Sequence, residues 1–209
     1  MTMKDRHFTS RDDFPAELPD KKVMYCWTCK YPGVTNDKIY KEKYRCMNCG
    51  NLNERCLIFD PQMRYSFDEK GRLAHYGGGI FILNDRKETL FFLRRRFPYL
   101  LTIPGGHMVF GEDPYKCAMR EVKEEVNIKI VNAEKIFEGF LEGDECVGGA
   151  DIHYWYLYKS SDYKGKIKLD EEGSKWEWFD IKNIDLNKLT YPVRYFLEDE
   201  VIRNKLLED

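Results

Sequence analysis

The chain has 209 residues, a size that fits one domain or one domain with a small module. Hydrophobic residues make up 43% and aromatic residues 15%, which excludes a wholly disordered chain. The formal net charge is −2, because 34 Lys and Arg nearly cancel 36 Asp and Glu, so no global charge draws the chain to nucleic acid or anionic membranes. No apolar run approaches the roughly 18 residues of a membrane span, and the N-terminus lacks a hydrophobic signal-peptide core, so we expect a cytoplasmic protein.

The composition and residue pattern change along the chain, and these changes predict four segments. Residues 1–22 are polar and proline-punctuated, and we interpret them as an N-terminal arm. Residues 23–56 hold paired cysteines, residues 57–72 form a connector, and Asp68–Gly71 is expected to be a hairpin turn. Strand and helix patterns begin at Leu73, so residues 73–209 are predicted to form the main domain.

Four of the seven cysteines form two pairs, Cys26-x2-Cys29 and Cys46-x2-Cys49, with sixteen residues between them. Two residues between cysteines let a tight turn aim both sulfurs at one metal, and two such turns complete a tetrahedron. The alternative is four unconnected buried thiols. An odd number of cysteines without a secretion signal argues against a disulfide framework. The spacing therefore predicts a zinc ribbon whose Zn²⁺ is structural, since protein would fill all four positions.

The predicted ribbon has a basic and aromatic composition. Lysines, including Lys41 and Lys43, are interleaved with Tyr and Trp between residues 21 and 49. Basic and stacking groups together can bind nucleotides or single-stranded nucleic acid. The other interpretation is a small module whose aromatic side chains form its core and whose lysines form its solvated rim. We favour the second interpretation, so nucleic acid is the less favoured partner.

From residue 73 onward, short β-prone runs alternate with turns, and two helices complete the pattern. Residues 78–83 and 90–93 predict a hairpin across the turn at 84–87. We expect further strands at residues 128–131, 136–141, 151–158 and 176–180, and a helix over residues 191–207. A mixed sheet with two helices fits this order, and the fold class is α+β.

The strongest predicted helix covers residues 114–126, with Asp113 as its N-cap and Asn127 after its end. Glu121, Glu124 and Glu125 share a sector about 100° wide that borders the buried face of this helix. Three crowded carboxylates repel one another, whereas Mg²⁺ or Mn²⁺ would reverse the sign of their interaction. The alternative is an ordinary solvated face of charged residues.

The residues around this helix carry a resemblance to a known family. Gly106, five residues, Glu112, seven residues and then Arg120-Glu121-Val122-x-Glu124-Glu125-x-Asn127-Ile128 resemble the Nudix box of the Nudix hydrolases. Asn127 stands where the family usually has glycine, and asparagine also tolerates a left-handed helix end. The resemblance covers residues 73–206 and implies a Nudix-type α/β/α sandwich with a mixed sheet, preceded by the small zinc ribbon.

What the resemblance implies is hydrolysis of a pyrophosphate bond in a nucleoside diphosphate linked to another moiety. Mg²⁺ or Mn²⁺ would be held by Glu121, Glu124 and Glu125, and Arg120 would orient these glutamates through Glu112. Further roles follow from the positions of other residues. Glu172 is the candidate general base or extra metal ligand, with Glu124 as its rival. Gly105 and Gly106 would allow a tight turn at the substrate. Arg94, Arg95 and Arg96 either contact phosphates or are solvated charges at the end of a strand.

The choice of substrate stays open at this point. A zinc ribbon before a Nudix domain resembles NADH pyrophosphatases and ADP-ribose pyrophosphatase-like enzymes, but the Ser-Gln-Pro-Trp-like run of the former is absent. Nucleotide sugars, ADP-ribose or dinucleotides are favoured over nucleoside triphosphates, which a housecleaning enzyme would take. A non-catalytic nucleotide sensor with a nucleic-acid-binding ribbon is the alternative from another class. We expect a small-molecule nucleotide as partner and no membrane, and a homodimer is compatible with the sequence.

Overall fold

The computed structural model describes residues 20–40, 43–144, 146 and 148–208, so most of the predicted arm lies outside the described residues. The chain divides into two compact units. The first comprises the chain up to Tyr76 with Val109–Gly111 and Phe140–Tyr154, and the second comprises Gly77–Met108, Glu112–Gly139 and Trp155 onward. None of the seven cysteines, all of which lie in the described residues, is joined in a disulfide. Across the described ranges, no helix is both long and apolar enough to cross a membrane.

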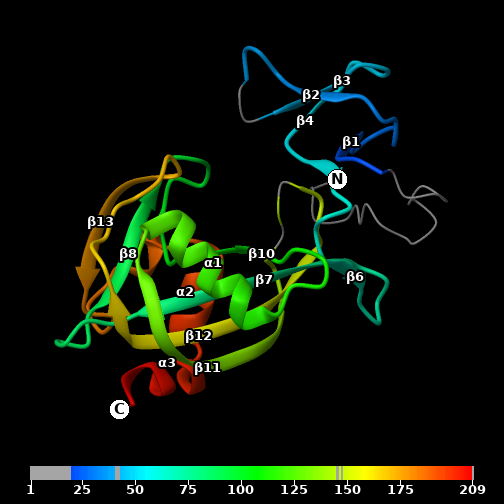
Figure 1. Ribbon diagram of the computed structural model, residues 1–209. Helices are drawn as coiled ribbons and strands as arrows, with labels where there is room; N and C mark the ends of the chain where they lie inside the picture. Colours follow the sequence, from blue (N-terminus) through cyan, green and yellow to red (C-terminus); the bar gives the residue numbers. More distant parts are fainter. Residues whose placement is uncertain (1–19, 41–42, 145, 147, 209) are drawn as a thin grey trace. The chain divides into compact units, whose positions relative to one another are not determined.

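The first unit contains short antiparallel strands (Figure 1). Its strands are β1 (Val23–Cys26), β2 (Val34–Asn36), β3 (Tyr44–Cys46), β4 (Leu52–Asn53), β5 (Cys56–Phe59) and β6 (Tyr65–Phe67). Strand β1 pairs with β5, and β2, β3 and β4 form a three-stranded sheet. The turn predicted at Asp68–Gly71 is confirmed, because the Asp68 amide donates to the Arg72 carbonyl oxygen at 3.0 Å and joins β6 to the next strand.

Aromatic side chains of the predicted ribbon take part in packing. Tyr25 and Trp27 lie against the buried pair Leu57 and Leu73. Tyr44 packs on a second cluster, formed by Cys26, Val34, Cys46 and Cys56. Tyr31 and Tyr40 are exposed, and Lys43 pairs with Glu54 at 3.5 Å, while Lys41 lies outside the described residues. Three of these five aromatic side chains therefore contribute to the apolar interior of the unit.

The remaining chain builds two sheets and three α-helices (Figure 1). Its strands are β7 (Leu73–Ile82), β8 (Thr89–Arg94), β9 (Leu101–Thr102), β10 (Gly105–His107), β11 (Lys129–Leu141), β12 (Ile152–Lys164) and β13 (Gly173–Phe179). One sheet has the order β10-β7-β12-β11, with β6 also paired to β7, and the other has the order β13-β8-β9. The helices are α1 (Pro114–Val126), α2 (Tyr191–Glu198) and α3 (Glu200–Leu207), with a 3-10 turn at Leu186–Lys188.

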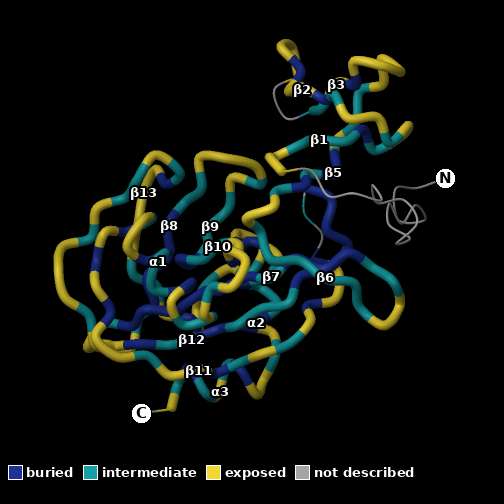
Figure 2. Tube along the Cα trace, turned by 45° about the vertical axis from the view of Figure 1, so that its right-hand side comes forward, coloured by how far each residue is buried: buried dark blue, intermediate teal, exposed yellow. Residues whose placement is uncertain are grey.

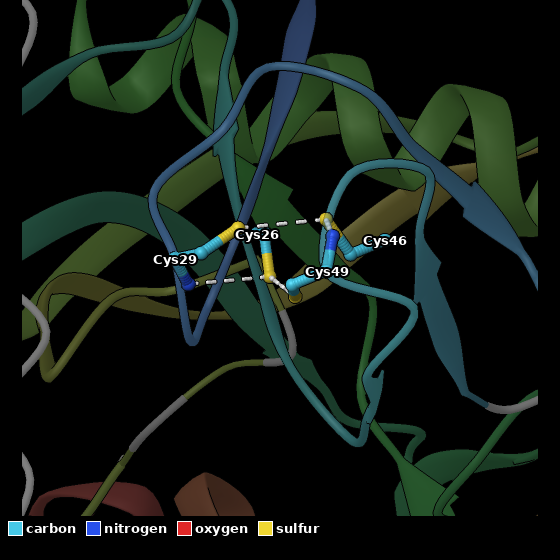
Figure 3. A group of neighbouring side chains, drawn as sticks. All are labelled: Cys26, Cys29, Cys46 and Cys49. Atoms are coloured by element: carbon cyan, nitrogen blue, oxygen red, sulfur yellow. Dashed lines mark hydrogen bonds between the residues drawn. The ribbon is translucent and has the colours of Figure 1, made fainter.

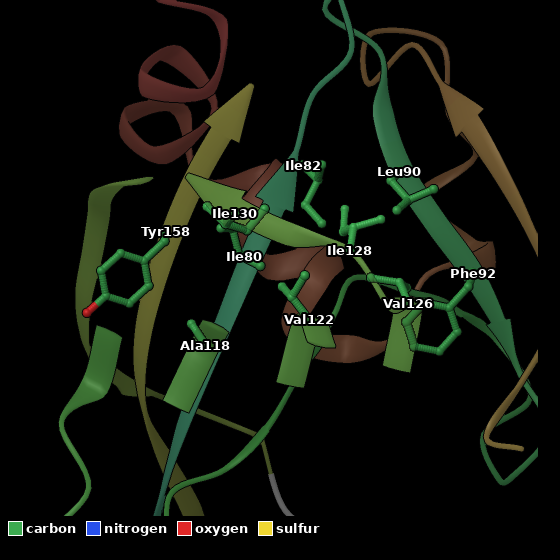
Figure 4. Packing of buried hydrophobic residues seen from close by; sticks show 10 residues of the cluster. All are labelled: Ile80, Ile82, Leu90, Phe92, Ala118, Val122, Val126, Ile128, Ile130 and Tyr158. Carbon is green, nitrogen blue, oxygen red and sulfur yellow. The ribbon is translucent and has the colours of Figure 1, made fainter. Parts of the chain in front are cut away.

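Strand β7 is buried on both faces, which explains its continuous apolar sequence. Ile80 and Ile82 point to one side and join a cluster with the apolar face of α1 (Figure 4). Phe81 alternates to the other side, where its ring lies 6.5 Å from Phe196 of α2. Figure 2 shows the burial along these strands. The expected helix–sheet–helix arrangement is therefore confirmed in this unit.

Three predicted elements differ from the structure. Strands β7 and β8 follow one another through a tight turn but enter different sheets, joined only at the Leu83–Thr89 bridge among the described pairings. The strands expected at 128–131 and 136–141 are one strand, β11, because the polar residues between them lie on its exposed face. The final helix is two helices, since the Asp199 carboxylate caps the amide of Ile202 and restarts the helix.

Candidate active site and metal centres

The four paired cysteines meet at one point (Figure 3). The Sγ atoms of Cys26 and Cys49 lie 3.8 Å apart, and those of Cys29 and Cys46 lie 3.6 Å apart. A tetrahedral zinc with Zn–S bonds of about 2.3 Å requires sulfurs about 3.8 Å apart. The ligand atoms of all four residues lie within 4.8 Å of one another. The donor set and its spacing fit Zn²⁺, and these four residues would hold it.

Both cysteine turns have the same local geometry. The amides two and three residues after Cys26 donate to its Sγ at 3.3 and 3.5 Å, and those after Cys46 do so at 3.4 and 3.5 Å. Each turn ends in a left-handed residue, Lys30 with φ 62° and Gly50 with φ 72°. A lysine in this conformation costs about 1 kcal/mol, so the first turn is held by its surroundings. Backbone N–H groups aimed at sulfur stabilise thiolates, the form that binds zinc.

Helix α1 begins and ends where the sequence predicts. The Asp113 carboxylate accepts from the Lys116 amide at 3.1 Å, and Asn127 adopts φ 57° at the C-terminal end. Its buried residues are Cys117, Ala118, Glu121, Val122 and Val126. The acidic stripe therefore enters the buried face at one edge, because Glu121 is 9% exposed while Glu124 is exposed to solvent.

Arg120 is the hub of the acidic residues. Its guanidinium makes a two-bond contact with Glu112, from Nε at 2.9 Å and from Nη2 at 3.1 Å. Its Nη1 donates to Glu121 at 2.7 Å and to Glu124 at 3.1 Å, and its Nη2 donates to the His107 carbonyl at 3.0 Å. Arg120 thus contacts Glu112, as the sequence suggests, and it also contacts Glu121 and Glu124 directly.

Glu125 has the most perturbed carboxyl group of the site. Burial raises its pKa to about 8, although the Gly105 amide donates to its Oε2 at 2.8 Å and opposes this rise. Negative charge on Glu121, Glu172 and Asp170 raises the pKa further. Burial also raises the pKa of Glu121, and Arg120 opposes that rise. Carboxylates held together against their own repulsion and desolvation suit a divalent cation with oxygen ligands.

The glycines before the helix serve a different purpose from the one expected. Gly105 and Gly106 do not form a tight turn, because they lie in β10, paired with Gly79 and Gly78 of β7. A Cβ on Gly106 would stand 2.6 Å from the Glu121 carboxyl carbon, and one on Gly105 would stand 2.8 Å from a β7 carbonyl oxygen. Glycine is therefore needed because a Cβ at these positions would clash, and its absence lets the Glu121 carboxyl lie directly over the strand.

The segment before β13 also reaches the helix. Backbone amides of Lys168 and Asp170 donate to the carbonyl oxygens of Val126 and Glu125, at 3.0 and 3.2 Å. These contacts satisfy the end of α1 and bring two further carboxylates, Asp170 and Glu172, within electrostatic reach of Glu125. Sequence reasoning identified Glu172 but missed Asp170, whose only signal is the acidic run at 170–172.

The three consecutive arginines lie at the end of β8, as expected. The Arg96 guanidinium pairs with the Glu172 carboxylate at 2.8 Å, and the Arg95 amide donates to the Glu172 carbonyl at 2.8 Å. Arg94 is the last residue of the strand and faces Gly173 of β13. A second residue that sequence reasoning missed is Cys117, buried beneath Arg120, whose Sγ lies 3.7 Å from Nη2. No sequence signal distinguishes Cys117 from an ordinary core residue.

Comparisons with known proteins agree with this geometry. The model of the NUDIX domain family matches residues 74–199. A MutT NUDIX hydrolase from Burkholderia pseudomallei is similar in fold, with 21% identity, coverage of 61% of this chain and 98% of that one, and a TM-score of 0.53. The NUDIX domain of Shewanella oneidensis NrtR, solved with ADP ribose, has 15% identity, coverage of 68% and 94%, and a TM-score of 0.53. A C. elegans Ap4A hydrolase has 22% identity, coverage of 64% and 97%, and a TM-score of 0.50.

The match to the family model, together with this site, supports a hydrolase of the pyrophosphohydrolase class. The chain belongs to the NUDIX domain family. Members of this family use divalent metals, and the Cys26–Cys49 group adds a candidate zinc ribbon in front of the matched region.

Proposed function

We propose that the protein catalyses Mg²⁺- or Mn²⁺-dependent hydrolysis of a pyrophosphate bond in a nucleoside diphosphate linked to another moiety. Nucleotide sugars, ADP-ribose and dinucleotides are the favoured substrates. The observation that carries the proposal is the position of the half-buried Glu125 beside the buried Glu121, whose carboxylate contacts the Arg120 guanidinium. On a helix face without a function, this arrangement of carboxylates would only lower stability, because desolvation and mutual repulsion both cost free energy.

Glu121, Glu124 and Glu125 are the proposed ligands of the divalent cation. Their donor atoms are carboxylate oxygens, which Mg²⁺ and Mn²⁺ prefer. When bound there, the metal would neutralise charge on the pyrophosphate and lower the pKa of a coordinated water. The chain contributes the positioning: the Gly105 amide fixes one oxygen of Glu125, and Arg120 fixes Glu121 and Glu124 against Glu112.

We propose Glu172 as the general base that accepts the proton of the attacking water, with Glu124 as its rival. Glu172 belongs to the segment anchored on the end of α1, and its carboxylate is oriented by Arg96. Arg94, Arg95 and Arg96 are the proposed phosphate contacts, together with the backbone of Gly105 and Gly106. Because Arg96 already pairs with Glu172, it would act on phosphate and base together.

A pair of variants separates the two candidate bases. Glu172→Gln and Glu124→Gln each remove one carboxylate. The pH profile of kcat at saturating Mg²⁺ and the dependence of activity on Mg²⁺ concentration are measured for both variants. The variant that lacks the base should lose the acidic limb of the profile, whereas the variant that lacks a ligand should regain activity as the metal concentration rises. If both variants keep the wild-type profile and rate, neither carboxylate is the base.

We propose a division into a ribbon at residues 23–56 and a catalytic domain at 73–209, joined by 57–72, in which the ribbon is a scaffold. The packing of Tyr25 and Trp27 on Leu57 and Leu73 supports the scaffold role. Lys43→Ala should then leave KM, zinc content and melting temperature unchanged. A KM raised more than about tenfold, equal to about 1.4 kcal/mol of lost binding, would instead assign the ribbon to the substrate site.

A substrate panel tests the reaction itself. The panel contains ADP-ribose, NADH, nucleotide sugars, dinucleoside polyphosphates and nucleoside triphosphates, each with Mg²⁺ and with Mn²⁺, and products are resolved by chromatography. Hydrolysis in H₂¹⁸O should place ¹⁸O in a phosphate product and leave the glycosidic bond intact. Turnover of triphosphates alone would favour the housecleaning activity. Binding of a nucleotide without turnover of any compound, in folded protein, would favour the sensor.

A further inference from the structure

A second group of metal-ligating side chains lies in the first unit, apart from the four paired cysteines. His75 on β7, His153 on β12 and Cys146 between β11 and β12 place one ligand atom each within 4.8 Å of one another. His75 is 2% exposed and His153 is 6% exposed. The three residues are separated by up to 78 positions in the sequence, so the fold alone brings them together.

We propose that His75, Cys146 and His153 form a second zinc site. The His75 Nδ1 atom lies 3.6 Å from the Cys146 Sγ atom. Tetrahedral zinc with bonds of about 2.0–2.1 Å to nitrogen and 2.3 Å to sulfur separates such ligands by about 3.6 Å. The two imidazole rings meet edge to face, with centroids 5.9 Å apart, so they do not stack over the shared space. A thiol with two imidazoles is a donor set suited to zinc rather than to Mg²⁺ or Ca²⁺.

His153 already has the outer partner that a zinc-binding histidine uses. Its Nδ1 lies 2.7 Å from the Asp144 carbonyl oxygen and 3.2 Å from the Asp144 carboxylate. Because Nδ1 is engaged by Asp144, Nε2 is the nitrogen left to bind a metal. Metal-ligating histidines characteristically donate their other N–H to a carboxylate or a backbone carbonyl, which fixes the tautomer and the ring orientation.

Hydrogen bonds that need no metal hold three carbonyl groups near the group, those of Cys146, Gly148 and Ala150. The Arg55 guanidinium donates to the Cys146 carbonyl oxygen at 3.1 Å and to the Ala150 carbonyl oxygen at 2.6 Å. The Ile58 amide donates to the Gly148 carbonyl oxygen at 2.9 Å. Where the loop ends, the Leu73 amide bonds the Asp151 carboxylate at 3.0 Å, two residues before His75 in the same strand. The Cys146 carbonyl is thus anchored before any metal binds, which lowers the cost of assembling a metal site.

The same arginine joins this group to the zinc ribbon. Arg55 lies over the ring of Trp27, 4.4 Å from its centroid, and Trp27 stands between the ribbon ligands Cys26 and Cys29. The second group contains one thiol, whereas the ribbon site contains four. The two sites should therefore differ in spectrum, although they share one packed unit.

The test is metal analysis of the full chain purified without chelators and with excess Mg²⁺ to occupy the carboxylate site. We expect close to two zinc ions per chain, and close to one for Cys146→Ser. Cys56→Ser is the matched control, because Cys56 is also a buried thiol of this unit but lies outside the group, and it should retain two. Wild-type protein that binds one zinc ion, unchanged in Cys146→Ser, would overturn the proposal.

Cobalt substitution provides a readout that does not depend on stability. Replacing zinc with Co²⁺ gives sulfur-to-metal charge-transfer absorbance in proportion to bound thiolates, so Cys146→Ser should lose about a fifth of it. His75→Gln keeps a hydrogen-bonding side chain and should lower the affinity of the second site by about 10-fold or more while the ribbon spectrum is retained. A wild-type spectrum in both variants would show that the group is a hydrogen-bonded thiol–imidazole cluster without metal.

Discussion

Replacing Glu125 by glutamine separates the electrostatic role of this carboxylate from its shape. The change is nearly isosteric, and a glutamine oxygen can still accept the Gly105 amide that now lies 2.8 Å from Oε2. What disappears is one negative charge among the proposed metal ligands. We expect kcat at saturating Mg²⁺ to fall by at least about 10²-fold, comparable to the loss of one transition-state electrostatic partner.

The metal-free protein should respond in the opposite direction. Burial raises the pKa of Glu125 to about 8 from an ordinary value of 4.5, so the folded chain binds this proton more tightly than the unfolded chain does. The contribution of Glu125 to the free energy of unfolding is therefore most favourable below about pH 4.5 and declines as the pH rises toward 8. The two pKa values differ by an amount equivalent to about 5 kcal/mol, an upper bound because buried carboxylates relax and admit water.

Chemical denaturation with chelator, at pH values from 5 to 9, measures this difference. Glu125→Gln should match the wild-type chain near pH 5 and exceed its free energy of unfolding by about 2 kcal/mol near pH 8.5. Glu198→Gln, an exposed glutamate on α2, is the matched control and should shift neither kcat nor stability. Full turnover in Glu125→Gln, or a stability difference that does not change with pH, would refute the assigned environment.

Three further substitutions test the surrounding contacts. Cys46→Ser should remove the ribbon zinc and the hydrogen-exchange protection of β3 while α1 stays protected, and unchanged zinc content would contradict the four-cysteine site. Gly106→Ala places a methyl group 2.6 Å from the Glu121 carboxyl carbon, so kcat should fall by about 10²-fold, and an unchanged kcat would exclude Glu121 as a ligand. Arg120→Lys keeps the charge but loses the two-bond contact with Glu112. The Mg²⁺ concentration for half-maximal activity should therefore rise, and the free energy of unfolding should fall by about 1.5–3 kcal/mol. Wild-type values of both quantities in this variant would argue against a positioning role for Arg120.

Local signals in the sequence predicted α1 well, because they act within one or two turns. Asp113 and Asn127 mark its ends by their own side-chain and backbone preferences, and the cysteine spacing sets the geometry of the two cysteine turns. The partial burial of Glu125 could not be predicted in this way. It depends on β10 and on the 168–172 segment, which contact the helix from more than 15 residues away in sequence.

Long-range contacts also explain the elements that were predicted wrongly. Strand β11 continues through polar residues because its exposed face needs no apolar side chain, a fact set by the neighbouring strand β12. The glycines of β10 were assigned to a turn because glycine in sequence signals conformational freedom. In the fold it provides space for Glu121 instead. His75, Cys146 and His153 carry no shared sequence spacing, so only the assembled strands bring them together.

The saturated guanidinium of Arg120 has a consequence for the order of catalysis. Arginine has five N–H donors, and the contacts of Arg120 with Glu112, Glu121, Glu124 and the His107 carbonyl engage each of its three nitrogens. The Arg120 guanidinium is therefore not available to bind phosphate. The carboxylates around it repel a nucleotide that carries no metal. The kinetically competent substrate should be the metal–nucleotide complex, or the nucleotide should bind second, after the metal. Calorimetry in chelator should then detect no nucleotide binding, and free nucleotide in excess over metal should inhibit by withdrawing the metal rather than by competing for the site.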